Sequence, residues 1–475
     1  MTSRASLPGE WPEALAAAAS PRSSTERRPQ CNLSTSAVAA CLAACSLVIG
    51  APAGAQPPSV VVASTAPWVV WQYSTAQPSC GGADYPDVPA RPFLAGSGAQ
   101  QKVLWFASNS SGSWSSVGVG TTPDILATLA RGPGCTPWLP PARYIGTTPE
   151  SYDTGLWAVA PYTRDGVNIY ALVHNEFHGE WTRIEGQTYC WQQTSTIFLP
   201  CDYWNLVGAL SSNAGASFAL AQSAPGVNVP AIALTQPYVA PSPTSQSTIP
   251  QGMTAQSNII QIGAYLYVLA QQLGPPGSAI PDGVCVFRAA VPVRPDQAPF
   301  WFGFDGIGFS IVSPQIYPGK ATQPCKPVFG SQFRFSWSFN TILNQFILLG
   351  LDSVGNVNTG DCPLAEGTGT PDTAIVYMTV TMDGGGLLVP ATQETCLLQV
   401  NGIAAWQQQQ GMTGAAYPSL LDPQSPELVS IDLNFQFSGA TPFLYYTRLN
   451  PKGPGNLEGE DRDLVRVPLS VTAGP

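Results

Sequence analysis

Glycine and proline interrupt this sequence so often that long helices are excluded. The 475 residues include 46 glycines and 47 prolines. Proline breaks the interior of a helix, and glycine lowers helix stability. After the N-terminal segment, no stretch longer than about a dozen residues places apolar side chains at helical spacing without meeting one of them. We therefore expect an all-β chain of many short strands joined by turns.

The composition indicates a packed protein and disfavours nucleic acid as a partner. The chain is 44% hydrophobic and contains 13 tryptophans, 16 tyrosines and 18 phenylalanines, whereas disordered chains are poor in aromatic residues. The formal net charge is −10, and no basic cluster follows residue 56, so contact with phosphates is disfavoured. An acidic surface rich in aromatic residues suits neutral ligands such as sugars.

Residues 1–55 have the features of an export signal. An arginine pair at 27–28 precedes an apolar, alanine-rich run over 33–49, and a small-x-small cleavage site lies at 53–55. This pattern predicts a secreted or periplasmic protein with no transmembrane segment in its mature part. The alternative is a lipoprotein signal, in which Cys45 would carry the lipid anchor.

The cysteine count also favours export. Of 11 cysteines, three lie in the signal, and an even number in an exported protein predicts disulfides. We expect four bonds, formed between successive cysteines. A zinc cluster is the alternative, although no Cys-x-x-Cys motif occurs. The eight cysteines of the mature chain are Cys80, Cys135, Cys190, Cys201, Cys285, Cys325, Cys362 and Cys396.

One pattern occurs five times along the sequence. It consists of a short β run, a turn and a hydrophobic strand, and a further strand follows. Five such units predict a five-bladed β-propeller of four-stranded antiparallel sheets, stapled by disulfides, as one domain over residues 56–475. A pair of β-sandwiches is the structural alternative. The repeated strands are 102–108, 168–174, 264–270, 344–350 and 442–448, and the approximate blades are 84–150, 151–235, 255–315, 330–390 and 395–472.

Several motifs carry a family resemblance. They are 87–93 followed by 103–106, 170–176, 257–260, 283–288, 417–422 and 444–448. Together they resemble exported bacterial five-bladed propellers related to glycosidases of the arabinanase and β-xylosidase type. In those enzymes an aspartate on the innermost strand of the first blade is the general base, which implies this role for Asp87. The segment 211–218 is similar to the sialidase Asp-box turn, with Asn213 where aspartate is usual.

The resemblance also has a gap. Those glycosidases carry a further aspartate and a glutamate on inner strands of later blades, but the strands at 157–161 and from Ser257 contain no carboxylate. Two functions therefore stay open. The chain is a glycoside hydrolase that uses paired carboxylates, or it is a non-catalytic carbohydrate- or surface-binding propeller whose site has degenerated.

The candidate catalytic residues are Asp87, Glu176 and Asp422. Glycoside cleavage needs one carboxylic acid to protonate the leaving oxygen and one carboxylate on the other side of the sugar. We predict Glu176 as the acid, Asp87 as the base with Arg91 keeping it ionised, and Asp422 as a third carboxylate. A turn role is the alternative for both aspartates, because Asp87 precedes Pro89 and Pro423 follows Asp422.

His174, Glu176 and His178 alternate along one strand, so their side chains can share a face. They could line a polar rim, or they could bind a metal such as zinc, which is a separate hypothesis. We assign no metal and no cofactor, and we expect a carbohydrate ligand. Tryptophans such as Trp105, Trp157 and Trp301 could stack on sugar rings. The predicted substrate-binding residues are Arg91, His174, Ser257, Asn258, Asp352, Tyr417 and Arg448.

Overall fold

The structure is a computed structural model that describes most of the chain after residue 58. The predicted export signal, the lipid-anchor candidate Cys45 and four of the eight cysteines that follow the predicted signal lie outside the described residues. These residues are 59–73, 86–108, 114–116, 124–131, 138–139, 149–178, 183–184, 187–188, 202–233, 251–254, 256–274, 279–315, 323–330, 336–402, 413–429, 432–451 and 461–474.

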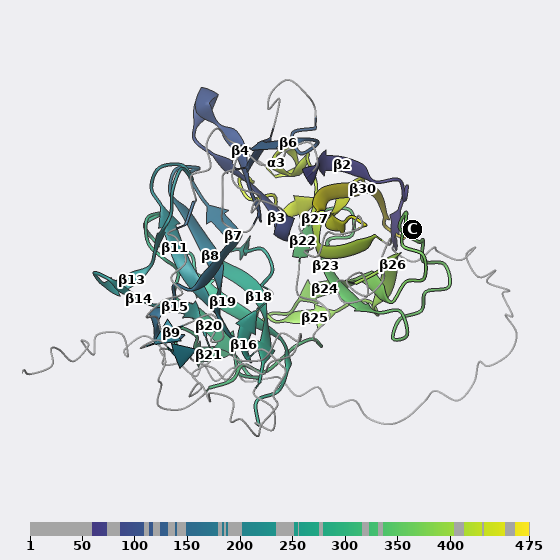
Figure 1. Cartoon of the computed structure of the whole chain (residues 1–475). Coiled ribbons are helices and arrows are strands. Elements are labelled where there is room, and N and C mark those ends of the chain that lie inside the picture. The colour runs from purple at the N-terminus through teal and green to yellow at the C-terminus, as the bar shows by residue number, and fades with distance from the viewer. Residues whose placement is uncertain are drawn as a thin grey trace, which may run out of the picture. The chain divides into compact units, whose positions relative to one another are not determined.

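The described part of the chain is built almost entirely from antiparallel strands (Figure 1). A four-stranded sheet has the order β3-β4-β5-β6, with strands Pro86–Ala95, Lys102–Ser108, Trp114–Ser116 and Leu129–Arg131. A five-stranded sheet has the order β1-β30-β29-β27, with β2 also paired to β30, and its strands are Ser59–Val62, Arg462–Thr472, Phe443–Leu449, Gly414–Leu421 and, for β2, Trp68–Trp71.

An 11-stranded sheet has the order β21-β20-β19-β18-β16-β11-β8-β7, with β12 and β15 attached to β11 and β17 to β18. Its strands are Gly155–Thr163 (β7), Ile169–His178 (β8), Asp202–Ser211 (β11), Ala219–Leu220 (β12), Pro230–Ile232 (β15), Gln251–Thr254 (β16), Ile260–Ile262 (β17), Tyr265–Leu273 (β18), Gly283–Ala290 (β19), Trp301–Phe304 (β20) and Phe309–Val312 (β21). The pairing of β11 with β16 is parallel and joins two antiparallel halves.

A six-stranded sheet has the order β25-β24-β23-β22-β28, with β26 paired to β24. Its strands, β22 to β26 and then β28, are Ser336–Asn340, Gln345–Ser353, Thr373–Met382, Leu388–Pro390, Thr395–Val400 and Phe437–Ser438. Two small hairpins pair Arg183–Ile184 (β9) with Gln187–Thr188 (β10) and Gln222–Ala224 (β13) with Val227–Asn228 (β14). The helical elements are single turns, η1 at Gly98–Gln100, η2 at Pro149–Ser151 and α3 at Ser425–Leu428.

The all-β prediction is confirmed, and each of the five repeated strands predicted from the sequence falls on an observed strand. They are β4, β8, β18, β23 and β29. These strands are runs of apolar and β-branched or aromatic residues bounded by turn residues, the pattern that a buried strand requires. Within the described residues, no helix has the length and apolar character needed to cross a membrane.

Five hydrophobic clusters lie among the described strands, and each is shared by successive groups of strands. Burying aromatic and aliphatic side chains in this way contributes roughly 1.5–3 kcal/mol for each large side chain. The clusters join β3–β4 to β7–β8–β11, β7–β8–β11 to β18–β19–β20, β17–β19 to β22–β24, β23–β26 to β1 and β27–β30, and β2 with β27–β30 to β3–β4.

The first described strands pair with the last one, a contact that the sequence did not suggest. Both β1 and β2, purple in Figure 1, pair antiparallel with β30, which is yellow. Arg466 of β30 is buried, lies 5.0 Å from the ring centroid of Trp68 in β2 and donates a 2.6 Å hydrogen bond to Asp124. Strand pairing and this buried cation therefore attach the N-terminal strands to the C-terminal end of the chain.

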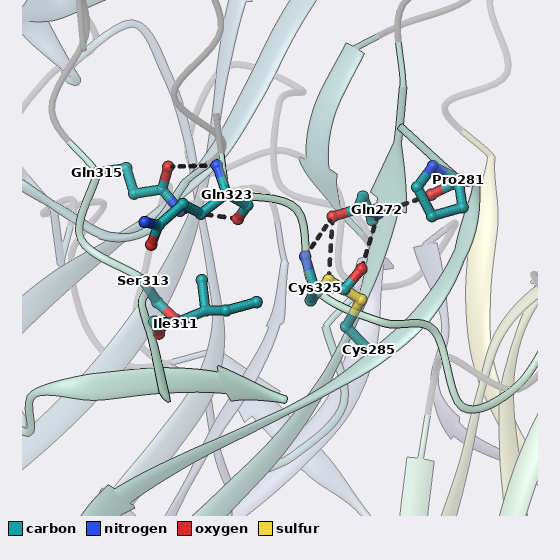
Figure 2. The surroundings of a disulfide bond; sticks show 8 residues. All are labelled: Gln272, Pro281, Cys285, Ile311, Ser313, Gln315, Gln323 and Cys325. Atoms are coloured by element: carbon teal, nitrogen blue, oxygen red, sulfur yellow. Dashed lines mark hydrogen bonds between the residues drawn. A yellow bond between two sulfur atoms is a disulfide. The ribbon is translucent and has the colours of Figure 1, made fainter. Parts of the chain in front are cut away.

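Two disulfides follow the predicted sequential pairing, Cys285–Cys325 and Cys362–Cys396. Figure 2 shows the first, where the buried Gln272 holds the bonded segment. Its Oε1 accepts the Cys325 backbone N–H at 3.0 Å, and its Nε2 donates to the Pro281 carbonyl at 2.6 Å. This disulfide therefore fixes a segment against β18 and β19, while the other predicted bonds lie outside the described residues.

The Asp-box-like segment forms a turn between β11 and β12. The Asn213 Oδ1 accepts from the Ser211 hydroxyl at 2.8 Å and from the Ser217 backbone N–H at 3.1 Å. Gly215 adopts φ of +78°, which glycine tolerates without a steric cost. The motif therefore acts within the hairpin, as its resemblance implied.

Candidate active site

Asp87 lies where the first sheet departs from regular pairing. It is the second residue of β3, and the β3–β4 register shifts between Pro86 and Arg91. Pro89 lies inside this interval and has no N–H to donate to the ladder. Such bulges bend a strand and redirect side chains. The local sequence therefore frees Asp87 from the sheet so that its carboxylate can meet other strands.

Three side chains from two other sheets contact the Asp87 carboxylate. Arg462, the first residue of β30, forms an ion pair with Oδ1. The Tyr417 hydroxyl of β27 donates to the same oxygen at 3.2 Å, and the Trp157 Nε1–H of β7 donates to Oδ2 at 3.1 Å. The carboxylate is therefore oriented on both of its oxygens, yet 16% of its side chain stays accessible to solvent.

Burial raises the pKa of the Asp87 carboxyl above its ordinary value of 3.8. The charge of Arg462 and the hydrogen bond from Trp157 oppose this rise, and the negative charge of Glu176 adds to it. Trp157 joins the two predicted catalytic carboxyl groups by contact, because its indole bonds Asp87 and packs beside His174, the partner of Glu176. A raised pKa makes Asp87 a stronger proton acceptor, while Arg462 favours its charged form.

Tyr417 reaches Asp87 from a second irregular strand. The β27–β29 register shifts between Ala416 and Ser419, and Tyr417 has φ of +54°, which is rare for a bulky residue. Backbone strain of this kind is concentrated at functional sites. Burial, followed by the charge of Asp87, raises the pKa of the Tyr417 hydroxyl, so it stays protonated and donates its hydrogen bond.

Glu176 and His174 share one face of β8, as their alternation predicted. His174 Nε2 lies 2.8 Å from Glu176 Oε1, and the side chains are 11% and 19% exposed. The buried His174 Nδ1 has no hydrogen-bond partner among the described contacts. A proton on Nδ1 would therefore lack an acceptor, which assigns the proton to Nε2 and the hydrogen bond to Oε1 of Glu176.

Two tryptophans flank His174. The Trp157 ring centroid lies 6.0 Å from that of the imidazole, and the Trp204 centroid lies 5.5 Å from it. Both indoles are half-buried and present apolar surface beside the carboxyl groups. Trp105 and Trp301, two other stacking candidates, are instead buried in the core. Half-buried indoles beside carboxyl groups are suited to contact with the apolar faces of a sugar.

The structure thus brings together four residues that the sequence predicted, Asp87, His174, Glu176 and Tyr417. It adds Arg462, which lies 375 residues from Asp87 in the chain and could not be recognised by any local motif. It also adds Trp204, which lies opposite Glu176 in the β8–β11 register. A signal for Trp204 existed, because an aromatic residue on a strand beside the His-x-Glu pair could have been expected to share its face.

Arg91 has contacts other than the predicted one. It is buried, and its Nη1 donates to the Ser419 hydroxyl at 2.7 Å and to the Ala90 carbonyl at 3.0 Å. The ion pair that the structure describes for Asp87 is made by Arg462. The sequence favoured Arg91 because it is close to Asp87 along the chain, but on a strand of this kind proximity in sequence does not fix direction.

Ser257 and Asn258, predicted to bind substrate, are buried and bonded to backbone groups. The Ser257 hydroxyl donates to the Asn258 carbonyl at 2.9 Å and accepts from the Leu269 N–H at 2.9 Å. The Asn258 side chain pairs with both backbone groups of Trp337, at 2.9 and 3.0 Å. These contacts join β22 to the segment before β17, so the two residues serve the packing of the sheets.

Asp422, predicted as the third carboxylate, occupies a turn. Its Oδ1 accepts from the Gln424 N–H at 2.9 Å, and its Oδ2 accepts from the Gly439 N–H at 2.7 Å. It is 2% exposed. None of its described contacts involves Asp87 or Glu176, and both oxygens satisfy backbone donors, which agrees with the turn alternative.

The described contacts of two further predicted substrate-binding residues, Arg448 and Asp352, are made away from Asp87. Arg448 donates to Asp463 at 2.6 Å, and in the β29–β30 register these two residues lie one position along from Arg462, on the opposite face. Asp352 accepts from the Asn356 side chain at 2.9 Å, and its carboxyl group adds to the raised pKa of Glu394. The described contacts do not connect either residue to the Asp87 site.

The metal hypothesis receives no support from the described residues. Among them, no group of three or more histidine, cysteine, aspartate or glutamate side chains is placed to hold an ion. The side chain of His178, the third member of that hypothesis, lies outside the described part. The hypothesis therefore stays a prediction.

No protein-family model and no curated protein matches the chain. Solved structures do, and they include glycoside hydrolases with propeller folds, as the motifs predicted. A Bombyx mori GH32 β-fructofuranosidase mutant in complex with sucrose is 12% identical, with a TM-score of 0.36 over 84% of this chain and 62% of that one. This chain thus spans less than two thirds of that enzyme.

Two others are spanned almost fully. A family 117 glycoside hydrolase of Zobellia galactanivorans is 8% identical, with a TM-score of 0.40 over 88% of this chain and 91% of that one. A Cellvibrio cellulosa α-L-arabinanase complexed with arabinohexaose is 11% identical, with a TM-score of 0.31 over 80% of this chain and 91% of that one.

Proposed function

We propose that this chain is a glycoside hydrolase that uses Asp87 and Glu176 as its two carboxyl groups. The observation that carries the proposal is their placement. They come from different sheets, Trp157 contacts both Asp87 and the His174 that pairs with Glu176, and both carboxyl groups are partly accessible to solvent. Cleavage of a glycosidic bond needs two carboxyl groups on opposite sides of the bond, in different environments.

The surroundings support a different role for each group. Asp87 is held by Arg462, Tyr417 and Trp157, which suits a carboxylate that must stay oriented as base or nucleophile. Glu176 accepts a hydrogen bond on Oε1, so a proton to be donated would lie on Oε2. Positioned acid–base groups of this kind contribute roughly 10²–10⁴ in rate.

We further propose that the fold is a closed five-bladed propeller. Five hydrophobic clusters between successive groups of strands support this, because the last group packs on the first through β2, β27–β30 and β3–β4.

We also propose export by the segment 1–55. The two disulfides support it, because such bonds persist in oxidising compartments.

The second candidate is a carbohydrate-binding propeller without catalysis. A specific observation favours it: both oxygens of Asp87 already accept hydrogen bonds, and Asp422 binds turn amides instead of joining the pair. A third carboxylate of the kind that the family resemblance implied is therefore not supplied by Asp422. In this case the half-buried tryptophans would bind sugars, and no bond would be cleaved.

The test compares the wild type with Asp87→Asn and Glu176→Gln on a panel of aryl glycosides and plant and algal glycans. We expect kcat/KM to fall about 10²–10⁴-fold in each variant. The exposed Asp296, paired only with Arg294 in the described contacts, provides the control Asp296→Asn, which should match the wild type. A wild type that binds glycans by calorimetry but cleaves none supports the second candidate and removes the first.

Leaving groups separate the two roles. A dinitrophenyl leaving group needs little protonation, so Glu176→Gln should recover much of its rate on such a substrate, while Asp87→Asn should not. If instead Asp87→Asn recovers, the roles of acid and base are reversed. The anomeric form of the first product, read by NMR, then reports the stereochemical outcome.

A further inference from the structure

Trp157 contacts both halves of the proposed site. Its Nε1–H donates to Asp87 at 3.1 Å, and its ring lies beside the His174 imidazole with centroids 6.0 Å apart. His174 in turn lies 2.8 Å from Glu176. One indole therefore completes a continuous series of contacts from the first carboxyl group to the second, across two sheets.

Gly155 leaves the space in which this indole lies. It is opposite Glu176 in the β7–β8 register, two residues before Trp157 and so on the same face. A Cβ added at Gly155 would lie 2.5 and 2.7 Å from Cζ3 and Cη2 of Trp157, closer than real Cβ contacts, and 3.2 Å from the Glu176 carbonyl oxygen. Glycine inside a strand is unfavourable unless another group must approach closely.

The Trp157 ring cannot move away from Gly155 without changing its contacts with Asp87 and His174. Moving it off Gly155 shifts its six-membered ring, which is rigidly fused to the pyrrole that carries Nε1. The hydrogen bond to Asp87 and the packing on His174 would then change together. The separation of the two carboxyl groups decides how a glycosidase can act, so a group that spans them controls a sensitive distance.

We propose that Trp157 is the positioning residue that fixes Asp87 relative to Glu176, and that Gly155 is required because only glycine admits its indole. The inference rests on the proposed function for its catalytic consequence, and on contacts of the described residues for its geometry. It assigns Gly155 and Trp157 one joint role, which a double-mutant cycle can measure.

The cycle uses Gly155→Ala, Trp157→Phe and the double variant. Phenylalanine has no atoms at the positions of Cζ3 and Cη2, so the alanine methyl should fit in its presence. We expect kcat/KM to fall about 100-fold in Gly155→Ala, because small displacements of reacting groups have effects of that size. We expect a smaller loss of kcat/KM, about tenfold, in Trp157→Phe. The double variant should lose no more than Trp157→Phe alone. Gly384→Ala, at an exposed turn glycine with open space around it, is the control.

A second measurement distinguishes positioning from general damage. Because the Trp157 hydrogen bond lowers the pKa of Asp87, its loss should move the acidic limb of the kcat/KM profile to higher pH in all three variants but not in Gly384→Ala. The Asp87 carboxyl can also be titrated directly by ¹³C NMR. That titration needs no activity, so it tests the inference even if the wild type cleaves no glycan and the proposed function fails.

Three results would overturn the proposal. The first is a double variant whose loss equals the product of the single losses, which would make Gly155 independent of Trp157. The second is an Asp87 titration that is the same in all variants. The third is a double variant that unfolds as readily as Gly155→Ala, because the alanine methyl would then clash with a group other than the indole. If Gly155→Ala fails to fold and the double variant folds, the result supports the proposal.

Discussion

The polar side chains around Asp87 and those around Asn258 are satisfied in different ways. Asp87 is bonded to side chains of Arg462, Tyr417 and Trp157, which come from other sheets, and it stays partly exposed. Asn258, in contrast, is bonded to backbone groups of Trp337 and is buried. Both regions contain residues that the sequence predicted for the site, Asp87 as a catalytic residue and Asn258 as a substrate-binding residue.

The difference teaches how such residues can be sorted. A buried side chain that pairs with backbone groups replaces a missing ladder bond, so its polarity serves the fold. A partly exposed side chain held by other side chains is oriented at some cost in stability, and that arrangement suits a ligand. The two regions should therefore respond to mutation in opposite ways, one by losing stability and the other by losing activity.

Asn258→Ala should give the largest loss of stability. Removing its amide leaves the N–H and C=O of buried Trp337 without these partners, and each such group costs about 1–3 kcal/mol. We expect the free energy of unfolding, measured in urea, to fall by about 3 kcal/mol. Glycan affinity should stay within twofold. A stable variant with impaired glycan binding would move Asn258 into the functional group.

Asp422→Asn should behave in the same way with a smaller effect. An asparagine oxygen can still accept one backbone N–H, but its NH₂ group would face the other donor, either Gln424 or Gly439. We expect a loss of about 2 kcal/mol in unfolding free energy, since hydrogen bonds to charged groups contribute about that much. Activity at a temperature well below the transition should match the wild type; a thousandfold loss of kcat would instead restore Asp422 as a catalytic carboxylate.

Tyr417→Phe tests the other region. It removes one donor to Asp87 and leaves the ring, so unfolding free energy should change by about 1 kcal/mol or less. We expect kcat/KM to fall about tenfold, because Asp87 is then oriented by fewer groups. Tyr445→Phe, which removes a core hydroxyl that donates to the Leu126 carbonyl and accepts from Arg466, is the control and should leave kcat/KM unchanged. Equal effects of the two variants on kcat/KM would erase the distinction.

Glu394→Gln should give the smallest effect on stability. It also tests whether Asp352, next to Glu394, belongs to the Asp87 region. Burial raises the pKa of Glu394 from 4.5 to about 7, and the carboxyl group of Asp352 adds to the rise. A raised folded-state pKa means stabilisation that is present below pH 4.5 and is lost as pH rises to about 7. Because solvent reaches much of the Glu394 side chain and screens its charge, we expect a change under about 1 kcal/mol.

The measurement is the melting temperature at pH 4.5, 6 and 8. The wild type should lose slightly more stability than Glu394→Gln over this range, and the two should bind glycans equally. Parallel curves would mean that the two carboxyl groups do not share a proton. A loss of binding in Glu394→Gln would place Asp352 with the Asp87 region after all.

The sequence alone determined the strands and the turns that join them. Strands β4, β8 and β18 were found because runs of apolar residues bounded by turn residues leave the backbone few other choices. The same local logic placed His174 and Glu176 on one face of β8, since alternation on a strand is fixed by geometry. Two disulfides between successive cysteines also followed from order along the chain.

Only the tertiary structure decided which residues meet. Arg462 joins Asp87 across 375 residues, and Trp157 reaches Asp87 because Gly155 admits its ring. Asp422, Ser257 and Asn258 are polar residues of the types that bind ligands. Their polar atoms are nevertheless bonded to backbone amides or carbonyls. The physical reason is that side-chain direction at a bulge, and the partner it finds, depend on packing between sheets that are distant in sequence.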